Sequence, residues 1–181
     1  FLIALFTVLH ILFYLKHALG WRKVLPPSKS DQQSPFSIII PVRNEEENIE
    51  RIIRNLDIQD YPNALYEVII VDDFSEDQTV EKATKLKNEL SLNLQIIKLN
   101  DPAKQGKKHA LTKGIRSASH DRILTTDADC WFGNGWIQAY NNVFEDSLNM
   151  IAGPVAIQGK GLFARLQQLE FAGLIGFGAV T

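Results

Sequence analysis

The chain has 181 residues, of which 45% are hydrophobic and 22% are charged, and its formal net charge is -2. A chain of this length can bury a sizeable core as one domain, and a net charge of this sign argues against nucleic acid as a partner. The single cysteine, Cys130, excludes an internal disulfide and a cysteine-rich zinc site.

The N-terminal segment 1–21 is almost wholly apolar and predicts a transmembrane helix, because about 21 residues at ~1.5 Å each reach ~30 Å, one hydrocarbon thickness. Lys16 and the histidine after it shorten the uninterrupted apolar stretch, so a buried or interfacial helix is the alternative. Arg22 and Lys23 follow directly, and the positive-inside tendency then places the rest of the chain in the cytoplasm. The polar, proline-bearing residues 22–35 predict a linker.

Beyond the linker, short apolar runs alternate with segments of helical spacing. Strands are predicted at 36–42, 67–72, 94–99, 122–126 and 149–155, and helices at 49–56, 80–90, 107–118 and 135–144. Asn44, with Glu47 three residues later, predicts a capping box for the first of these helices. The alternation predicts an α/β fold over residues 36–158, in which helices flank a mainly parallel, Rossmann-like sheet. Ligands of such sheets bind beyond the carboxyl ends of the strands.

Two of the predicted strands run into pairs of acids, Asp72 with Asp73 and Asp127 with Asp129. Because the strands are parallel, both pairs should lie at one edge of the sheet. Neighbouring carboxylates repel one another unless a cation or a donor compensates them, and Mg²⁺ favours one or two carboxylates together with phosphate oxygens. The second pair therefore predicts a divalent-metal site for a diphosphate ligand. A solvated turn with helix-capping aspartates is the alternative for so short a pattern.

Four segments, in this order, resemble the motifs of family 2 glycosyltransferases, which have the GT-A fold. They are IPVRNEE at 40–46, VDDFSEDQT at 71–79, GKKHALTKG at 106–114 and DAD at 127–129. Each stands at the end of a predicted strand or the start of a predicted helix, and the resemblance covers residues 36–155. It implies a GT-A domain that binds a nucleotide-diphosphate sugar.

By position, the resemblance implies roles for individual residues. It assigns nucleotide-sugar binding to the loop after the first strand and to the acids of the second motif, namely Pro41, Arg43, Asn44, Glu45, Asp72 and Asp73. Lys107 would neutralise diphosphate charge, the alternative being an ordinary exposed lysine. Asp127 would contact the sugar or ribose and, with Asp129, would bind Mg²⁺ or Mn²⁺. The side chain of Ala128 should point away from the ligand.

The resemblance also implies a metal-dependent, inverting sugar transfer from a UDP-sugar to a lipid-linked or polysaccharide acceptor at the membrane. Residues 159–181 predict an amphipathic, interfacial helix, and we expect the catalytic base and a further C-terminal part beyond Thr181. Two alternatives stay open: a membrane-tethered nucleotide-sugar-binding module without catalysis, and a sugar-phosphate nucleotidyltransferase. The expected glycine-rich loop of the second alternative is missing after the first strand.

Overall fold

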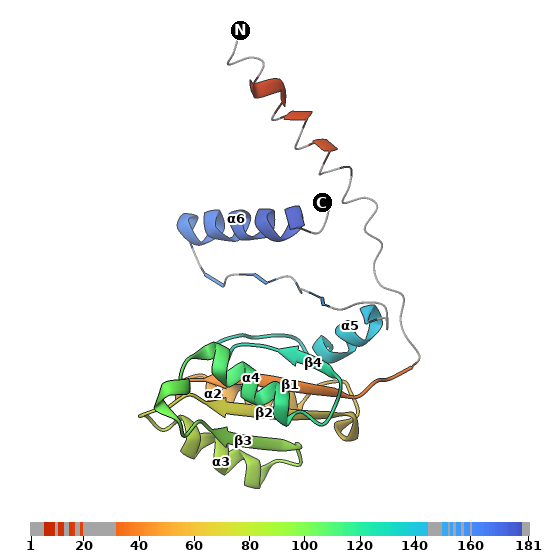
Figure 1. Ribbon diagram of the computed structural model, residues 1–181. Helices are drawn as coiled ribbons and strands as arrows, with labels where there is room; N and C mark the ends of the chain where they lie inside the picture. The colour runs from red at the N-terminus through yellow and green to blue at the C-terminus, as the bar shows by residue number, and fades with distance from the viewer. Residues whose placement is uncertain are drawn as a thin grey trace. The chain divides into compact units, whose positions relative to one another are not determined.

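The computed structural model describes residues 32–144 and 161–178 without a gap, together with residues 6–9, 11–12, 15–16, 19, 150–151, 153, 155–156 and 158–159 (Figure 1). The chain divides into two compact units. One is Lys29–Val143, and the other combines Phe1–Ser28 with Phe144–Thr181. All of the predicted site residues belong to the first unit.

A parallel sheet forms the centre of the first unit (Figure 1). Within the described residues it has four strands in the order β3-β2-β1-β4, with bounds β1 Phe36–Val42, β2 Tyr66–Asp72, β3 Leu94–Lys98 and β4 Arg122–Thr125. Ile38 of β1 lies opposite Val68 on one side and Leu124 on the other. Nearly every residue of β1 and β2 is buried, as expected for strands that are covered on both faces. The predicted α/β fold with a parallel sheet is confirmed.

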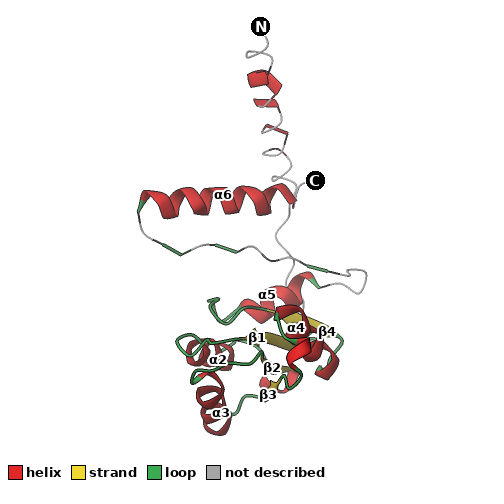
Figure 2. Ribbon diagram, turned by 60° about the vertical axis from the view of Figure 1, so that its left-hand side comes forward, coloured by secondary structure: helices red, strands yellow, loops and turns green. Residues whose placement is uncertain are grey.

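Helices cover both faces of this sheet. Figure 2 shows α2 (Ile49–Asp57) and α3 (Thr79–Glu89) on one face and α4 (Lys107–Ser117) on the other. Successive side chains of a strand point to opposite faces, and Ile39 accordingly packs with Ile69, Val71 and Ala110 of α4 in one buried cluster. The remaining elements of this unit are η1 (Asn63–Leu65), η2 (Pro102–Lys104) and α5 (Trp136–Val143).

The end of the predicted linker belongs to the first unit and is held there by hydrogen bonds. Ser34 is buried, and its N–H donates to the Tyr61 hydroxyl at 2.8 Å and to Asn141 Oδ1 at 3.1 Å. The Asn141 side chain in turn donates to the Gln32 carbonyl at 2.8 Å. Contacts with the domain therefore begin a few residues before β1.

The predicted strand at 149–155 is wrong over the residues that the structure describes. Met150, Ile151, Gly153 and Val155 are not in a strand, and the other residues of that prediction lie outside the described part of the chain. Gly153 and the proline after it interrupt the apolar run, and both residue types are unfavourable inside a strand.

The predicted capping box at Asn44 is also wrong. Asn44 has a left-handed backbone with a φ of 55°, and α2 begins only at Ile49. The Glu45 carbonyl accepts hydrogen bonds from the N–H groups of Asn48 and Ile49 at 3.0 and 2.8 Å. The chain thus makes an additional turn before the helix, and this turn leaves the Asn44 side chain available to another loop.

In the second unit, α6 (Leu162–Gly178) falls within the helix predicted at 159–181. Its exposed apolar side chains include Leu162, Phe163, Leu166 and Leu169. Of the segment 1–21, only residues 6–9, 11–12, 15–16 and 19 are described, and they are helical. Among the described residues of the chain, no helix has both the length and the apolar character needed to cross a membrane. The rest of that segment lies outside the described residues, as do linker residues 22–31.

Candidate functional site

A cleft opens at the carboxyl edge of the sheet, where β1, β2 and β4 end and α4 begins. Its volume is about 330 Å³, and its lining consists of Pro41, Val42, Arg43, Glu45, Asp73, Lys107, Asp127, Ala128 and Asp129. Parallel strands end at the same edge of a sheet, which explains why residues so far apart in the sequence meet here. The lining includes every predicted site residue except Asn44 and Asp72.

The loop after β4 presents two acids to this cleft. The side chain of Ala128 is buried, whereas Asp127 and Asp129 on either side of it are exposed. Lys107, the first residue of α4, places its Nζ 2.7 Å from Oδ1 and 2.8 Å from Oδ2 of Asp127. The ion pair brings the α4 lysine into the same site as the two acids.

Two exposed carboxylates on one short loop suit a hard divalent cation. Mg²⁺ and Mn²⁺ prefer oxygen ligands, and Mg²⁺ typically uses one or two protein carboxylates while phosphate oxygens and water complete its shell. The described residues contain no group of three or more His, Cys, Asp or Glu side chains that could form a cage made of protein alone. Asp127 and Asp129 therefore fit a metal that binds together with a phosphate ligand.

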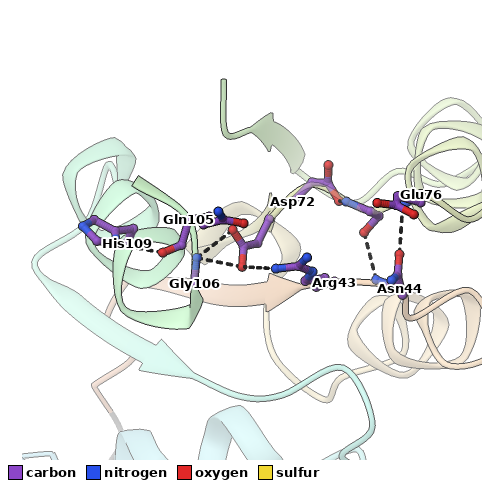
Figure 3. A network of polar contacts seen from close by, with 9 residues as sticks. Arg43, Asn44, Asp72, Glu76, Gln105, Gly106 and His109 are labelled. Atoms are coloured by element: carbon purple, nitrogen blue, oxygen red, sulfur yellow. Dashed lines mark hydrogen bonds and ion pairs between the residues drawn. The ribbon is translucent and has the colours of Figure 1, made fainter. Parts of the chain in front are cut away.

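The loops after β1 and β2 are joined by reciprocal hydrogen bonds. The Asn44 N–H donates to Ser75 Oγ at 3.0 Å, and the Glu76 N–H donates to Asn44 Oδ1 at 2.8 Å (Figure 3). Each loop has one non-glycine residue with a positive φ, 55° at Asn44 and 58° at Phe74. Asn44 therefore holds the two loops together and does not line the cleft.

A second set of contacts joins the same loops closer to the helices. The Glu45 N–H donates to Thr79 Oγ1 at 2.8 Å, and the Glu46 N–H donates to Asp77 Oδ2 at 3.1 Å. Burial raises the pKa of Asp77, but hydrogen bonds from Thr79 and Glu46 outweigh this effect and bring the pKa below its ordinary value. The backbone that carries Glu45 is thus fixed by the protein itself.

The adjacent acids Asp72 and Asp73 are both buried, at 4% and 5% exposure, and they have different partners. Asp72 Oδ1 accepts a hydrogen bond from the Ser75 N–H at 3.2 Å. Asp73 accepts the Gly106 N–H with both carboxylate oxygens, at 2.8 and 2.9 Å, and Arg43 Nη1 lies 3.9 Å from its Oδ2. Asp73 therefore fixes the residue immediately before α4, whereas Asp72 stabilises its own turn.

Residues 37–177 match the family model described as Glycosyl transferase family 2. The chain belongs to this family. Glycosyltransferase AglE of Haloferax volcanii is 37% identical over 105 residues, which are 58% of this chain and 34% of AglE. Poly-beta-1,6-N-acetyl-D-glucosamine synthase of Staphylococcus aureus is 29% identical over 154 residues, 83% of this chain and 36% of the synthase. The chain thus spans about a third of the length of these curated relatives.

Two solved structures resemble this family 2 domain. The mannosyltransferase PcManGT from Pyrobaculum calidifontis, in complex with GDP-Man and Mn²⁺, has a TM-score of 0.68 and 26% identity, over 76% of this chain and 40% of its own. Staphylococcus aureus TarS 1-349, in complex with UDP-GlcNAc, has a TM-score of 0.53 and 29% identity, over 59% of this chain and 30% of its own. These likenesses and the family match confirm the predicted family and its GT-A-like fold.

Sequence reasoning missed the residues of the family 2 domain that hold the loop after β4. Arg51 Nη2 donates to the Asp129 carbonyl at 3.0 Å, and Gln59 Nε2 donates to the Gly133 carbonyl at 3.1 Å. The first donor belongs to α2, and the second lies just beyond the C-terminal end of this helix. Only the apolar spacing of this segment carries a signal in the sequence, and it does not distinguish these two polar side chains from ordinary surface residues.

Proposed function

We propose that this domain binds a nucleotide-diphosphate sugar, with a UDP-sugar as the expected donor, as part of an inverting glycosyltransferase. The observation that carries the proposal is the meeting, in one cleft, of the exposed carboxylates of Asp127 and Asp129 with the cation of Lys107. Such a set can bind a diphosphate through a bridging metal and a direct positive charge. Membership of the family supports the same activity.

The cleft residues divide by their chemistry. Asp127 and Asp129 would hold Mg²⁺ or Mn²⁺, which when bound would neutralise the charge that develops on the departing diphosphate. We assign Lys107 to the diphosphate oxygens, because its ammonium group already lies beside Asp127. The nucleotide is assigned to the polar lining residues Arg43, Glu45 and Asp73 and to Pro41 near the end of β1. Asn44 and Asp72 support the loops around it.

The relatives support a nucleotide-sugar donor and differ in its base. The PcManGT structure contains GDP-Man and Mn²⁺, and the TarS structure contains UDP-GlcNAc. The choice of a UDP-sugar therefore rests on the motif resemblance. A polysaccharide acceptor is supported by the name of the poly-beta-1,6-N-acetyl-D-glucosamine synthase, and a lipid-linked acceptor at the membrane rests on the predicted helix 1–21.

A donor screen on the complete protein tests this proposal. UDP or GDP release from nucleotide sugars is measured with Mg²⁺, Mn²⁺ or EDTA, in the wild type and in Asp129→Ala. A matched control is Asp121→Ala, which removes an exposed carboxylate outside the cleft lining. We expect metal-dependent release in the wild type and the control, and its loss in Asp129→Ala.

Two outcomes would contradict the proposal in different ways. Undiminished release by Asp129→Ala would refute the metal assignment. Donor binding without release, with every acceptor and metal tested, would instead favour the nucleotide-sugar-binding module.

A further inference from the structure

A chain of hydrogen bonds connects the loop after β1 with the loop that bears Asp129. Arg51 Nη2, on α2, donates to the Asp129 carbonyl at 3.0 Å and to Asn48 Oδ1 at 2.9 Å. The Asn48 side chain donates in turn to Glu45 Oε2 at 2.8 Å. Glu45 and Asp129 both line the cleft, so these hydrogen bonds connect two of its lining residues.

We propose that Arg51 is a positioning residue for the metal-binding carboxylate of Asp129, and that through Asn48 it ties this carboxylate to the loop assigned to the nucleotide. The inference rests on the proposed function, since it concerns the same metal and the same donor. Arg51 lies outside the cleft lining and would act only through the backbone of Asp129.

The other described hydrogen bonds that tie this loop to neighbouring elements are made by residues other than Asp129. Lys107 Nζ donates to Asp127 Oδ2 at 2.8 Å, Gln59 Nε2 donates to the Gly133 carbonyl at 3.1 Å, and the Asp60 N–H donates to the Asn134 carbonyl at 2.8 Å. At the start of the loop, the Thr126 N–H donates to the Ile39 carbonyl at 3.3 Å, and within it the Cys130 N–H closes a turn onto the Asp127 carbonyl at 3.2 Å. None of these bonds connects Asp129 to another element. Among the described hydrogen bonds, the one from Arg51 does so, and a metal ligand whose orientation is not fixed binds its ion more weakly.

The sign of the effect distinguishes positioning from simple electrostatics. Arg51 carries a positive charge close to a site proposed for a cation, so removal of this charge alone should strengthen metal binding. Loss of the tether should weaken it. A weaker metal affinity in a variant without the guanidinium group therefore cannot come from the charge.

Arg54 offers a matched control on the same helix. It is half-exposed, and it pairs with Glu50 at 2.8 Å and lies 3.9 Å from Glu89. None of the hydrogen bonds or ion pairs described for Arg54 reaches a cleft residue. Its replacement by methionine removes the same charge and a similar side-chain volume from the same helix. Arg54→Met thus reports the effect of charge and of helix stability alone.

The test measures Mn²⁺ binding to the complete protein by electron paramagnetic resonance, with and without UDP, and UDP binding in EDTA. We expect Arg51→Met to weaken Mn²⁺ binding by about tenfold, the usual loss for a residue that orients a metal ligand. Arg54→Met should stay near the wild type. Arg51→Lys should recover part of the affinity, because an ammonium group can still donate to the Asp129 carbonyl. UDP affinity in EDTA should remain unchanged in Arg51→Met.

Asn48→Ala keeps the proposal testable if Arg51→Met fails to fold. This variant keeps the hydrogen bond from Arg51 to Asp129 and removes the link to Glu45. We therefore expect the Mn²⁺ affinity without UDP to change little, and the change in this affinity on addition of UDP to become smaller. Mn²⁺ binding by Arg51→Met as tight as that of the wild type, or tighter, overturns the inference alone. If the wild type shows no Mn²⁺ binding that is lost in Asp129→Ala, both the proposed metal site and this inference are overturned.

Discussion

Gly106 stands at the junction between the acid Asp73 and the start of α4, and its backbone conformation is open to few residues. Its φ is 103° and its ψ is 155°, a region that is populated almost only by glycine. In this conformation its N–H points at both oxygens of Asp73, at 2.8 and 2.9 Å, and the next residue is Lys107. Gly106→Ala should therefore disturb both stability and the position of the lysine.

The magnitude follows from the surroundings of the glycine. A Cβ atom at Gly106 would have no heavy atom within 4 Å, so steric overlap adds nothing to the cost. If the backbone keeps its conformation, the strain costs about 1–3 kcal/mol. If it relaxes, the hydrogen bonds to the Asp73 carboxylate are lost, at a similar cost of about 1.5–3 kcal/mol, and Lys107 moves. Either route lowers the free energy of unfolding by roughly 1–3 kcal/mol.

Urea unfolding and UDP titration of the same preparations measure both effects. Gly133→Ala is the control, since a Cβ there also meets open space and its φ is not in the positive range that disfavours side chains. We expect this control to stay within about 0.5 kcal/mol of the wild type. The reasoning is refuted if Gly106→Ala matches Gly133→Ala in unfolding free energy and in UDP affinity.

Three further predictions concern other parts of the domain. Gly114→Ala would overlap Ile39 Cγ2 across the α4–sheet contact, and we expect a loss of roughly 1–2 kcal/mol in thermal unfolding, because overpacking outweighs the helix preference of alanine. Burial raises the pKa of Glu67, but hydrogen bonds, mainly from Ser37 and Ser119, bring it below 4.5. Glu67 should therefore stabilise the fold above about pH 4.5 and lose this contribution as the pH falls. The difference in free energy of unfolding between the wild type and Glu67→Gln should accordingly become smaller in acid. A difference that does not change with pH would contradict this. In calorimetric titrations, Lys107→Met should weaken UDP binding about tenfold and leave uridine binding unchanged, because only the diphosphate interacts with the lysine. Equal losses of affinity for UDP and uridine would argue against this role.

The fold could be predicted where apolar residues carry the signal. The runs that form β1 and β2 are almost fully buried, and Ile49, Ile52, Ile53 and Leu56 of α2 are the residues whose spacing predicted that helix. The start of α2 could not be predicted, because the turn before it depends on a left-handed Asn44 that is held by the loop after β2. Contacts between distant loops decide such positions, and local spacing does not encode them.

The sequence predicted which residues form the site better than it predicted which partners each of them contacts. The rule that ligands bind where parallel strands end places Asp73, Asp127 and Asp129 in one cleft, and the structure brings them together there. The same rule does not distinguish Asp72 from Asp73, although Asp72 stabilises a turn and Asp73 fixes Gly106. That difference depends on which side chain meets which loop.

The two sides of the cleft are held differently, and this predicts how their variants fail. Asp73 is buried, so Asp73→Ala leaves the Gly106 amide without its acceptor and should cost about 1–3 kcal/mol of stability as well as donor affinity. Asp129 is exposed, and Asp129→Ala should abolish metal binding while the unfolding temperature stays close to that of the wild type. Thermal unfolding of both variants beside the Mn²⁺ titration separates the two cases. A fall in unfolding temperature as large in Asp129→Ala as in Asp73→Ala would mean that the acidic loop is part of the folding core and not a ligand site carried by it.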